Sequence, residues 1–347
     1  MTFPALTGVI EGFYGREWSW SLRGDYADFL SRCGLNSYLY CPKSDAHLRK
    51  RWREDWPAPD SAELRNLSAT YRARNLHWGV GLSPFALYLD YSAAQKQTLR
   101  ARIEQINALE GSLLAILFDD MPGDCPDLAA RQAEIVGDVL AWSEAQHLLV
   151  CPTYYSLDPV LEQHFGARPE DYWAALGREL PPGVGIFWTG NRVCSPSVSR
   201  SDLEEISGLL RRPVVLWDNY PVNDGAKGCK FLNLAPLPAR EAGLEAAVSG
   251  HFCNPMNQGL LSQYPLTGLG ALYGGPAVPV ESLFSSELAA ALLEDRAMFQ
   301  DLGLDGIKAE DKVALAARYA AMDDPAGAEV AQWLRGEYAF DPACLTG

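Results

Sequence analysis

The sequence predicts an α/β protein of the (β/α)8 TIM barrel class, followed by a small α-helical C-terminal extension. Three observations support this prediction. Short apolar runs alternate with amphipathic helical segments over the first 255 residues, the runs number eight, and small or polar residues gather at the C-terminal end of each run. An open, doubly wound sheet is the alternative, but it leaves that one-sided placement of polar residues unexplained.

The eight apolar runs have the length and composition of buried strands. Parallel strands that are covered by helices on both faces read as continuous apolar runs rather than as alternating patterns. The runs are Leu6–Glu11, Ser37–Cys41, His77–Leu82, Leu113–Phe118, Leu148–Thr153, Val184–Thr189, Val214–Trp217 and Ala246–Cys253.

Amphipathic helical patterns fill the segments between the runs. They are Tyr26–Cys33, Ser61–Arg74, Ala93–Ala108, Leu128–Ala145, Tyr172–Leu180, Ser201–Arg211 and Ala239–Ala247. After Asn257 the pattern changes. A Gly-rich passage over 266–279 leads into helical stretches at Glu287–Gln300, Asp311–Met322 and Ala328–Tyr338. We therefore predict a catalytic barrel over residues 1–265 and a helical extension over residues 266–347.

Bulk composition excludes several classes of protein. A formal net charge of −15 argues against binding to nucleic acid and to anionic membrane surfaces, because both need clusters of Lys and Arg. The first seven residues have no basic region and no long apolar segment, so we expect no signal peptide. No window approaches the length of a membrane span.

The cysteines and histidines show no metal-ligand spacing. The eight cysteines are scattered, at Cys33, Cys41, Cys125, Cys151, Cys194, Cys229, Cys253 and Cys344. There is no C-x-x-C pair and no Cys/His cluster in the sequence, so we expect no metal and no cofactor. Free thiols and the missing signal peptide together predict a reducing, cytoplasmic location.

Two adjacent carboxylates, Asp119 and Asp120, end the fourth run. They are badly placed for stability and well placed for chemistry, because catalytic groups gather at the C-terminal ends of barrel strands. Neighbouring strand residues face opposite ways, so the two acids should have different environments and different protonation states. The alternative interpretation is a metal-binding or helix-capping acid pair.

The other strand ends supply side chains that suit a sugar pocket. Asp, Asn and Lys bind hydroxyl groups, and aromatic rings lie against the apolar faces of a sugar. Two of the ten tryptophans, Trp188 and Trp217, stand at strand ends, and for both we expect a role in the site rather than in the core.

Seven motifs stand in order at or near these strand ends. They are Gly8-Val9-Ile10-Glu11-Gly12-Phe13-Tyr14-Gly15-Arg16-Glu17-Trp18, Asn36-Ser37-Tyr38-Leu39-Tyr40-Cys41-Pro42-Lys43, Phe118-Asp119-Asp120, Cys151-Pro152-Thr153-Tyr154-Tyr155, Trp188-Thr189-Gly190, Trp217-Asp218-Asn219 through Asn223-Asp224, and Asn254-Pro255. Together they resemble family 84 glycoside hydrolases, the O-GlcNAcases and related β-N-acetylglucosaminidases. The resemblance covers roughly residues 6–260. It implies a (β/α)8 barrel and a retaining mechanism in which the 2-acetamido group of the substrate is the nucleophile.

The resemblance also implies roles for individual residues. Asp119 would orient and polarise the acetamido N–H while the acetamido oxygen attacks C1. Asp120 would protonate the leaving oxygen and then act as base for the water that opens the oxazoline. Around them, Tyr155 would hydrogen-bond the acetamido oxygen, Trp217 would help wall the acetyl pocket, and Asn219 would lie against the acids and order them. The hydroxyls of the sugar would be bound by Gly12 (through its backbone), Lys43, Asp224 and Asn254.

An adjacent acid pair fits this chemistry. Retaining glycosidases normally hold a nucleophilic carboxylate ~5–5.5 Å from the acid, but substrate-assisted families need no such second nucleophile. Asp120 must then carry a proton, which burial or the charge of Asp119 would favour, and the pair should titrate as a coupled unit.

The sequence thus predicts a β-N-acetylglucosaminidase whose substrate is a GlcNAc-bearing protein or glycan, with O-linked GlcNAc on Ser or Thr as the expected target. Three alternatives stay open. The enzyme could act on small GlcNAc-terminated saccharides, the protein could be a non-catalytic GlcNAc-binding module, or the acid pair could bind Mg²⁺. The sequence leaves the oligomeric state open.

Overall fold

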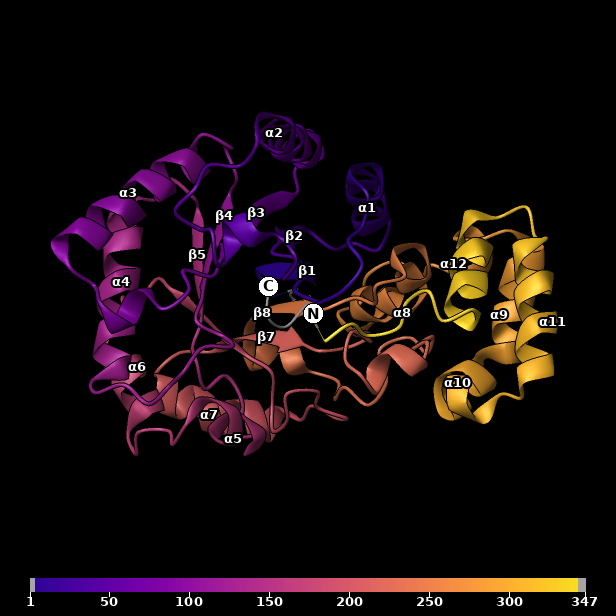
Figure 1. Ribbon diagram of the computed structural model, residues 1–347. Coiled ribbons are helices and arrows are strands. Elements are labelled where there is room, and N and C mark those ends of the chain that lie inside the picture. The colour runs from indigo at the N-terminus through magenta and orange to yellow at the C-terminus, as the bar shows by residue number, and fades with distance from the viewer. Residues whose placement is uncertain (1–3, 343–347) are drawn as a thin grey trace.

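The chain folds into a closed barrel of eight parallel strands. The computed structural model describes residues 4–342. The strands pair in sequence order from β1 to β8, and β8 pairs with β1, which confirms the predicted barrel class. Figure 1 shows the strands at the centre with helices around them and the C-terminal helices together on one side.

Each strand lies within two residues of its predicted bounds. The strands are β1 Leu6–Glu11, β2 Ser37–Tyr40, β3 His77–Leu82, β4 Leu113–Leu117, β5 His147–Cys151, β6 Gly185–Trp188, β7 Val214–Asp218 and β8 Val248–Cys253. All strand residues are buried except His77, His147, Gly185 and Ser249, which are partly exposed. Burial on both faces is the reason why the strands appear in the sequence as continuous apolar runs.

Eight α-helices belong to the described barrel. They are α1 Trp20–Arg32, α2 Ala58–Arg72, α3 Ala93–Asn107, α4 Leu128–Trp142, α5 Val160–Phe165, α6 Tyr172–Glu179, α7 Arg200–Leu210 and α8 Gly259–Leu272. The short helix α5 was not predicted.

The helix predicted over Ala239–Ala247 is not formed, and this prediction was wrong. The segment holds only a 3-10 turn at Leu244–Ala246, which follows Gly243 in the left-handed region at φ +88°. The side chain of Arg240 instead forms an ion pair with Asp218 of β7. Tertiary contacts have therefore overridden a helical pattern of Ala, Leu and Glu.

The second half of helix α8 overlaps the start of the Gly-rich passage predicted over 266–279. Its glycines serve close packing, because a Cβ on Gly270 would lie 2.3 Å from the carbonyl oxygen of Cys33 at the end of α1. The predicted division between residues 265 and 266 falls inside this helix.

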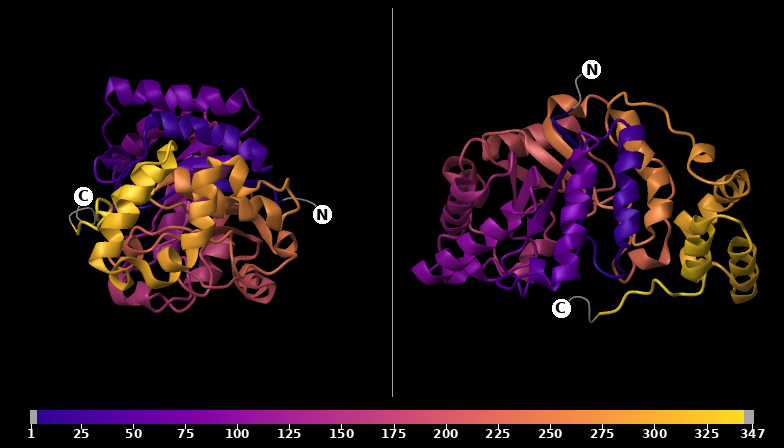
Figure 2. Two further views of the ribbon diagram at one scale, coloured as in Figure 1. Left: turned by 90° about the vertical axis from the view of Figure 1, so that its right-hand side faces the viewer. Right: turned by 90° about the horizontal axis from the view of Figure 1, so that it is seen from above.

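The C-terminal helices share a hydrophobic core with loops of the barrel. They are α9 Ser286–Ala297, α10 Gly303–Gly306, α11 Ala309–Ala320 and α12 Pro325–Leu334, with a π-helical turn at Met298–Leu302. Phe299, Tyr319 and Trp333 of these helices pack in one cluster with Leu232 and Met256, which follow β7 and β8. Figure 2 shows the group of helices beside the barrel. The extension is therefore anchored to the loops at the C-terminal ends of the strands.

Polar contacts reinforce this anchoring. Glu329 of α12 accepts hydrogen bonds from the backbone N–H groups of Leu260 (3.1 Å) and Leu261 (2.9 Å) in the first turn of α8. The N-cap residue of α8, Gln258, makes no such bond with its side chain, so a residue far along the chain supplies the cap. Burial raises the pKa of Glu329 to about 7.

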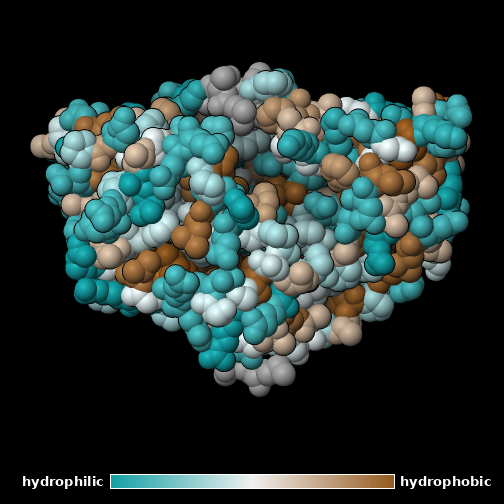
Figure 3. Space-filling view, turned by 90° about the horizontal axis from the view of Figure 1, so that it is seen from below, coloured by the Kyte–Doolittle hydropathy of each residue, from teal (hydrophilic) through white to brown (hydrophobic). Residues whose placement is uncertain are grey.

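The face of the molecule in Figure 3 is mostly hydrophilic, with several separate groups of apolar side chains. Over residues 4–342, no helix combines the length and the hydrophobicity needed to cross a bilayer. The seven cysteines within this range are free thiols, and Cys344 lies outside the described residues, as do the first three and last five residues of the chain.

Candidate active site

A cavity of about 220 Å³ opens at the C-terminal ends of the strands. All nine residues to which the resemblance gives a role line it: Gly12, Lys43, Asp119, Asp120, Tyr155, Trp217, Asn219, Asp224 and Asn254. They follow or end six different strands, so closure of the barrel is what brings them together. Because cavities for drug-sized ligands usually measure ~300–1,000 Å³, this one suits a single sugar ring.

Six further residues line the cavity: Tyr14, Cys151, Thr189, Val193, Cys194 and Val222. Tyr14 and Thr189 stand inside motifs at strand ends, so their positions carried a usable signal. Val193, Cys194 and Val222 lie in long loops, where the sequence offers no periodicity to place them.

Trp188 does not reach the cavity, so the role expected for it was wrong. Its side chain is 1% exposed and packs edge-to-face on Trp173, with the ring centroids 5.4 Å apart. Trp217 lies on the neighbouring strand and does line the cavity. Position at a strand end does not by itself decide which face of the strand a ring occupies.

Asp119 is buried and forms an ion pair with Lys43. The ammonium of Lys43 donates to Oδ2 of Asp119, and it lies 3.9 Å from Oδ2 of Asp120. Oδ1 of Asp119 is buried and has no hydrogen-bond partner among the described residues. Burial raises the pKa of Asp119 against the opposing effect of Lys43, and the nearby Asp120 raises it further. One acceptor atom of this carboxylate is therefore buried beside the cavity without a hydrogen-bond partner among the described residues.

Asp120 has a different environment from Asp119, but both acids lie in the turn after β4, so alternation along a strand is not the cause. The hydroxyl of Tyr14 donates to its Oδ2 at 2.7 Å, and that of Tyr155 donates to its Oδ1 at 3.3 Å. Its side chain is 22% exposed, against 7% for Asp119. The backbone of Asp120 lies in the left-handed region at φ +90°, which is uncommon for a residue other than glycine and is found at functional sites.

Tyr14 is in turn held by Arg49. The guanidinium Nη1 of Arg49 donates to the hydroxyl of Tyr14 at 2.9 Å. Arg49 is buried, and it carries a positive charge toward the side of the cavity where Asp120 lies. Lys43 thus supports Asp119 directly, and Asp120 has Lys43 at 3.9 Å and Arg49 behind Tyr14.

Asn219 lines the cavity, but its side chain is hydrogen-bonded to other wall residues. Its Oδ1 accepts from Nε1 of Trp217 (3.0 Å) and Nδ2 of Asn254 (3.0 Å), and its Nδ2 donates to the carbonyl of Val193 (2.8 Å). These hydrogen bonds go to the wall and not to the acids. The expectation that Asn219 orders the acids is therefore corrected: it orders the wall that carries Trp217.

Gly12 connects this wall to β1. Its N–H donates to Oδ1 of Asn254 at 3.2 Å. A Cβ at this position would lie 2.4 Å from Cζ2 of Trp217, so only glycine lets the ring come this close. Asp224 joins the same edge, because its Oδ2 accepts from the backbone N–H of Tyr14 at 2.8 Å. Burial raises the pKa of Asp224.

Comparison with known proteins gives a consistent result. A family profile described as beta-N-acetylglucosaminidase matches residues 7–279. The Protein O-GlcNAcase of Rattus norvegicus is 30% identical over 263 residues, and that of Mus musculus is 30% identical over 260 residues. Each alignment covers 72% of this chain but only 28% of the relative, so the chain spans little more than a quarter of their length.

One solved structure covers nearly the whole chain. It is a mutant of the O-GlcNAc hydrolase of Thermobaculum terrenum, which has a TM-score of 0.76 and 28% sequence identity. The match covers 96% of this chain and 81% of that chain. It therefore includes the C-terminal helices as well as the barrel.

The ion pair of Lys43 and Asp119 can be tested by stability alone. Lys43→Met leaves a buried carboxylate without its counter-charge, and we expect the variant to lose about 3–5 kcal/mol of unfolding free energy at pH 7. A carboxyl whose pKa is raised in the folded state destabilises the fold as the pH rises through that pKa. The loss should therefore shrink as the pH is lowered from 8 toward 5, as measured by chemical unfolding.

Lys96→Met is the matched control. Lys96 pairs with Asp138 at 2.6 Å, but both side chains are partly exposed. The Lys96→Met variant should lose little unfolding free energy, and this loss should not change with pH. A loss for Lys43→Met that is the same at pH 5 and pH 8 would contradict the assignment of a buried, charged Asp119.

Proposed function

Because the chain belongs to the beta-N-acetylglucosaminidase family, we propose that it is a retaining exo-β-N-acetylglucosaminidase that uses substrate-assisted catalysis. We further propose that its substrates are proteins carrying O-linked GlcNAc on Ser or Thr. The observation that carries the mechanism is the acid pair itself: Asp119 presents a buried acceptor atom without a partner, and Asp120 stands beside it within the same cavity.

In the first step, Asp119 accepts the N–H of the 2-acetamido group. Lys43 holds Oδ2 of this carboxylate, which leaves Oδ1 for the substrate. A buried acceptor without a partner is unfavourable, so the N–H of the substrate satisfies an existing requirement of the site. The hydrogen bond increases the electron density on the acetamido oxygen, which attacks C1.

As the bond from the acetamido oxygen to C1 forms, the bond from C1 to the leaving oxygen breaks. Asp120 supplies the proton to the leaving oxygen, and the sugar becomes an oxazolinium ion whose N–H stays hydrogen-bonded to the Asp119 carboxylate. A water molecule then gives a proton to Asp120 and attacks C1, which opens the ring with net retention. Tyr14 holds Oδ2 of Asp120 in place through both steps. The hydroxyl of Tyr155, which the resemblance assigns to the acetamido oxygen, donates to Oδ1 of Asp120 in this structure and would exchange that partner for the substrate.

Lys43 takes the role that a metal would have beside paired carboxylates. Its ammonium lies against Asp119 and within 3.9 Å of Asp120, so it already supplies the positive charge between them. This arrangement favours acid–base chemistry over the Mg²⁺ alternative, because a second cation would be repelled from the same position.

The dimensions of the cavity support exo-action on one terminal sugar. Gly12, Asp224 and Asn254 form an edge that is linked by hydrogen bonds, and the volume of about 220 Å³ matches one ring. Polar groups along this edge are suited to sugar hydroxyls.

We also propose that the protein acts in the cytoplasm, on the basis of its seven free cysteines within the described range.

Asp119→Asn should reduce kcat on every N-acetylglucosaminide by on the order of 100- to 1,000-fold, because the amide no longer carries the charge that promotes cyclisation. Steady-state hydrolysis of p-nitrophenyl N-acetylglucosaminide measures this. Asp124→Asn is the control, since that side chain is exposed and only four residues from the pair. Activity near the wild-type level in Asp119→Asn would rule out the proposed mechanism.

The loss of rate caused by Asp120→Asn should depend on the leaving group of the substrate. A poor leaving group needs protonation and should lose about 100- to 10,000-fold in rate, whereas an activated aryl leaving group should lose far less. The slope of log kcat/KM against leaving-group pKa for both enzymes is the measurement. Parallel slopes would contradict the role of Asp120 as acid.

The aglycone is tested by comparing two substrates with purified protein. We expect a GlcNAc-modified peptide to be hydrolysed with a higher kcat/KM than a GlcNAc-terminated disaccharide, and the activity to survive a metal chelator. The reverse preference would point to small saccharides. Binding of a GlcNAc-thiazoline analogue without hydrolysis of either substrate would indicate a binding module, and loss of activity with chelator would favour a metal.

A further inference from the structure

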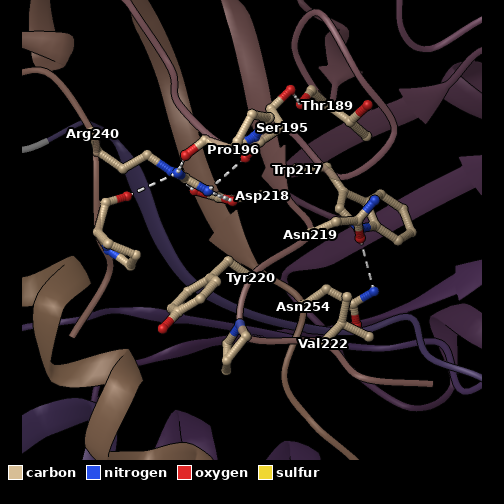
Figure 4. Close-up of polar contacts among 12 residues, drawn as sticks. Thr189, Ser195, Pro196, Trp217, Asp218, Asn219, Tyr220, Val222, Arg240 and Asn254 are labelled. Carbon is tan, nitrogen blue, oxygen red and sulfur yellow. Dashed lines mark hydrogen bonds and ion pairs between the residues drawn. The ribbon is translucent and has the colours of Figure 1, made fainter. Parts of the chain in front are cut away.

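Asp218 stands between two residues of the cavity wall but does not itself line the cavity. It is the last residue of β7, and Trp217 and Asn219 on either side of it face the cavity. Asp218 is 2% exposed and faces the other way, as alternation along a strand requires. Figure 4 shows Arg240 approaching it from the side opposite to Trp217 and Asn219. No step of the proposed mechanism uses either residue.

Arg240 makes two parallel hydrogen bonds to Asp218. Nε donates to Oδ2 at 2.6 Å and Nη2 donates to Oδ1 at 2.5 Å, and both side chains are 2% exposed. Burial acts to raise the pKa of Asp218, but Arg240 and His251 lower it by more, so the carboxylate stays charged. A paired geometry of this kind fixes orientation as well as distance.

The remaining donors of Arg240 bind three backbone carbonyls. Nη1 donates to Pro196 (3.2 Å) and Pro238 (2.9 Å), and Nη2 donates to Ser195 (3.3 Å). Ser195 and Pro196 belong to the loop that follows β6, and this loop also pairs with Arg240 through the backbone of Val198. One guanidinium therefore joins the end of β7 to the loop after β6, which a lysine could not do with the same geometry.

The same loop forms part of the cavity wall. It contributes Thr189, Val193 and Cys194 to the lining. Ser195 ties it into a tight turn, because its hydroxyl donates to the carbonyl of Thr189 at 3.0 Å. From the inner side, Asn219 donates to the carbonyl of Val193. The loop is thus held from outside by Arg240 and from inside by Asn219.

A metal at this position is disfavoured by the same contacts. Asp218, His251 and Cys253 present ligand atoms within 4.8 Å of one another, and all three are buried. Both oxygens of Asp218 are bound by Arg240, however, so a cation would meet a fixed positive charge. Burial lowers the pKa of His251, so its imidazole is neutral and adds a hydrogen bond to the carboxylate at 3.2 Å.

We propose that Arg240 is a positioning residue that sets the selectivity of the cavity for the N-acetyl group over longer N-acyl groups. By holding Asp218 and the loop after β6 together, it fixes the distance between Trp217 and the side chains of that loop. This proposal rests on the proposed function, and it takes Trp217, which lines the cavity, as the wall of the acetyl pocket that the resemblance implies. A wall that is held rigidly discriminates between acyl chains by steric exclusion, and a loosened wall admits a longer chain.

The test compares p-nitrophenyl N-acetylglucosaminide with its N-butanoyl analogue. Arg240→Lys keeps the positive charge but loses the paired bonds and most of the carbonyl contacts. We expect the ratio of kcat/KM for N-butanoyl over N-acetyl substrate to rise on the order of tenfold in this variant, chiefly through KM, since one or two methylene groups contribute about that much to discrimination.

Arg212→Lys is the matched control, because Arg212 also binds backbone carbonyls with its guanidinium. It donates to Pro181, Val184 and Leu180, just before β7 begins and therefore at the opposite end of the barrel. We expect it to lower the melting temperature without changing the ratio. Asp218→Asn, which weakens the paired bonds but keeps the shape of the side chain, should shift the ratio in the same direction as Arg240→Lys.

The outcomes separate the two proposals. Wild-type protein that hydrolyses neither substrate would overturn the proposed function. An active wild type with an unchanged ratio in Arg240→Lys, or an equal shift in Arg212→Lys, would overturn the role of Arg240. If Arg240→Lys fails to fold, the ratio in Asp218→Asn decides the question: a rise supports the role and an unchanged ratio overturns it.

Discussion

The pairing of β8 with β1 is the contact on which the site depends. Closure places the end of β1 beside the ends of β8 and β7. The N–H of Gly12 can therefore donate to Asn254, and the ring of Trp217 can pack against the Cα of Gly12. An open sheet built from the same strands would separate the first and last of them. The cavity is therefore a property of the closed barrel, because no single strand end or loop contains enough polar groups to bind a sugar.

Buried charged side chains near the C-terminal ends of the strands form ion pairs. Asp119 faces Lys43 and Asp218 faces Arg240, and each pair is buried. The two pairs do different things. The first leaves one buried carboxylate oxygen without a partner among the described residues, whereas in the second both oxygens are bound. An incompletely satisfied pair is suited to receive a substrate, and a fully satisfied pair is suited to hold a wall in place.

The C-terminal helices support the same edge of the barrel from outside. Glu329 caps α8, Trp333 donates to the carbonyl of Cys229 at 3.0 Å, and Arg16 donates to Gln332 at 2.9 Å. These contacts reach the loops after β8, β7 and β1, which carry Asn254, Asp224 and Gly12. The division of the chain at residue 265 describes the change of sequence pattern, but packing continues across it through α8 and the shared core.

The sequence by itself determined the barrel class, the strands to within two residues and nine of the fifteen residues that line the cavity. Burial on both faces and polar strand ends are local features of the chain, and the resemblance to family 84 glycoside hydrolases selected the nine residues among them. Only the tertiary structure decided that Trp188 is core and Trp217 is wall, that Ala239–Ala247 is not a helix, and that Asn219 orders the wall. Each of these depends on a partner far along the chain, such as Trp173, Asp218 or Val193. The apolar pattern of a segment indicates which of its residues can be buried. Contacts with residues elsewhere in the chain decide which way its side chains point.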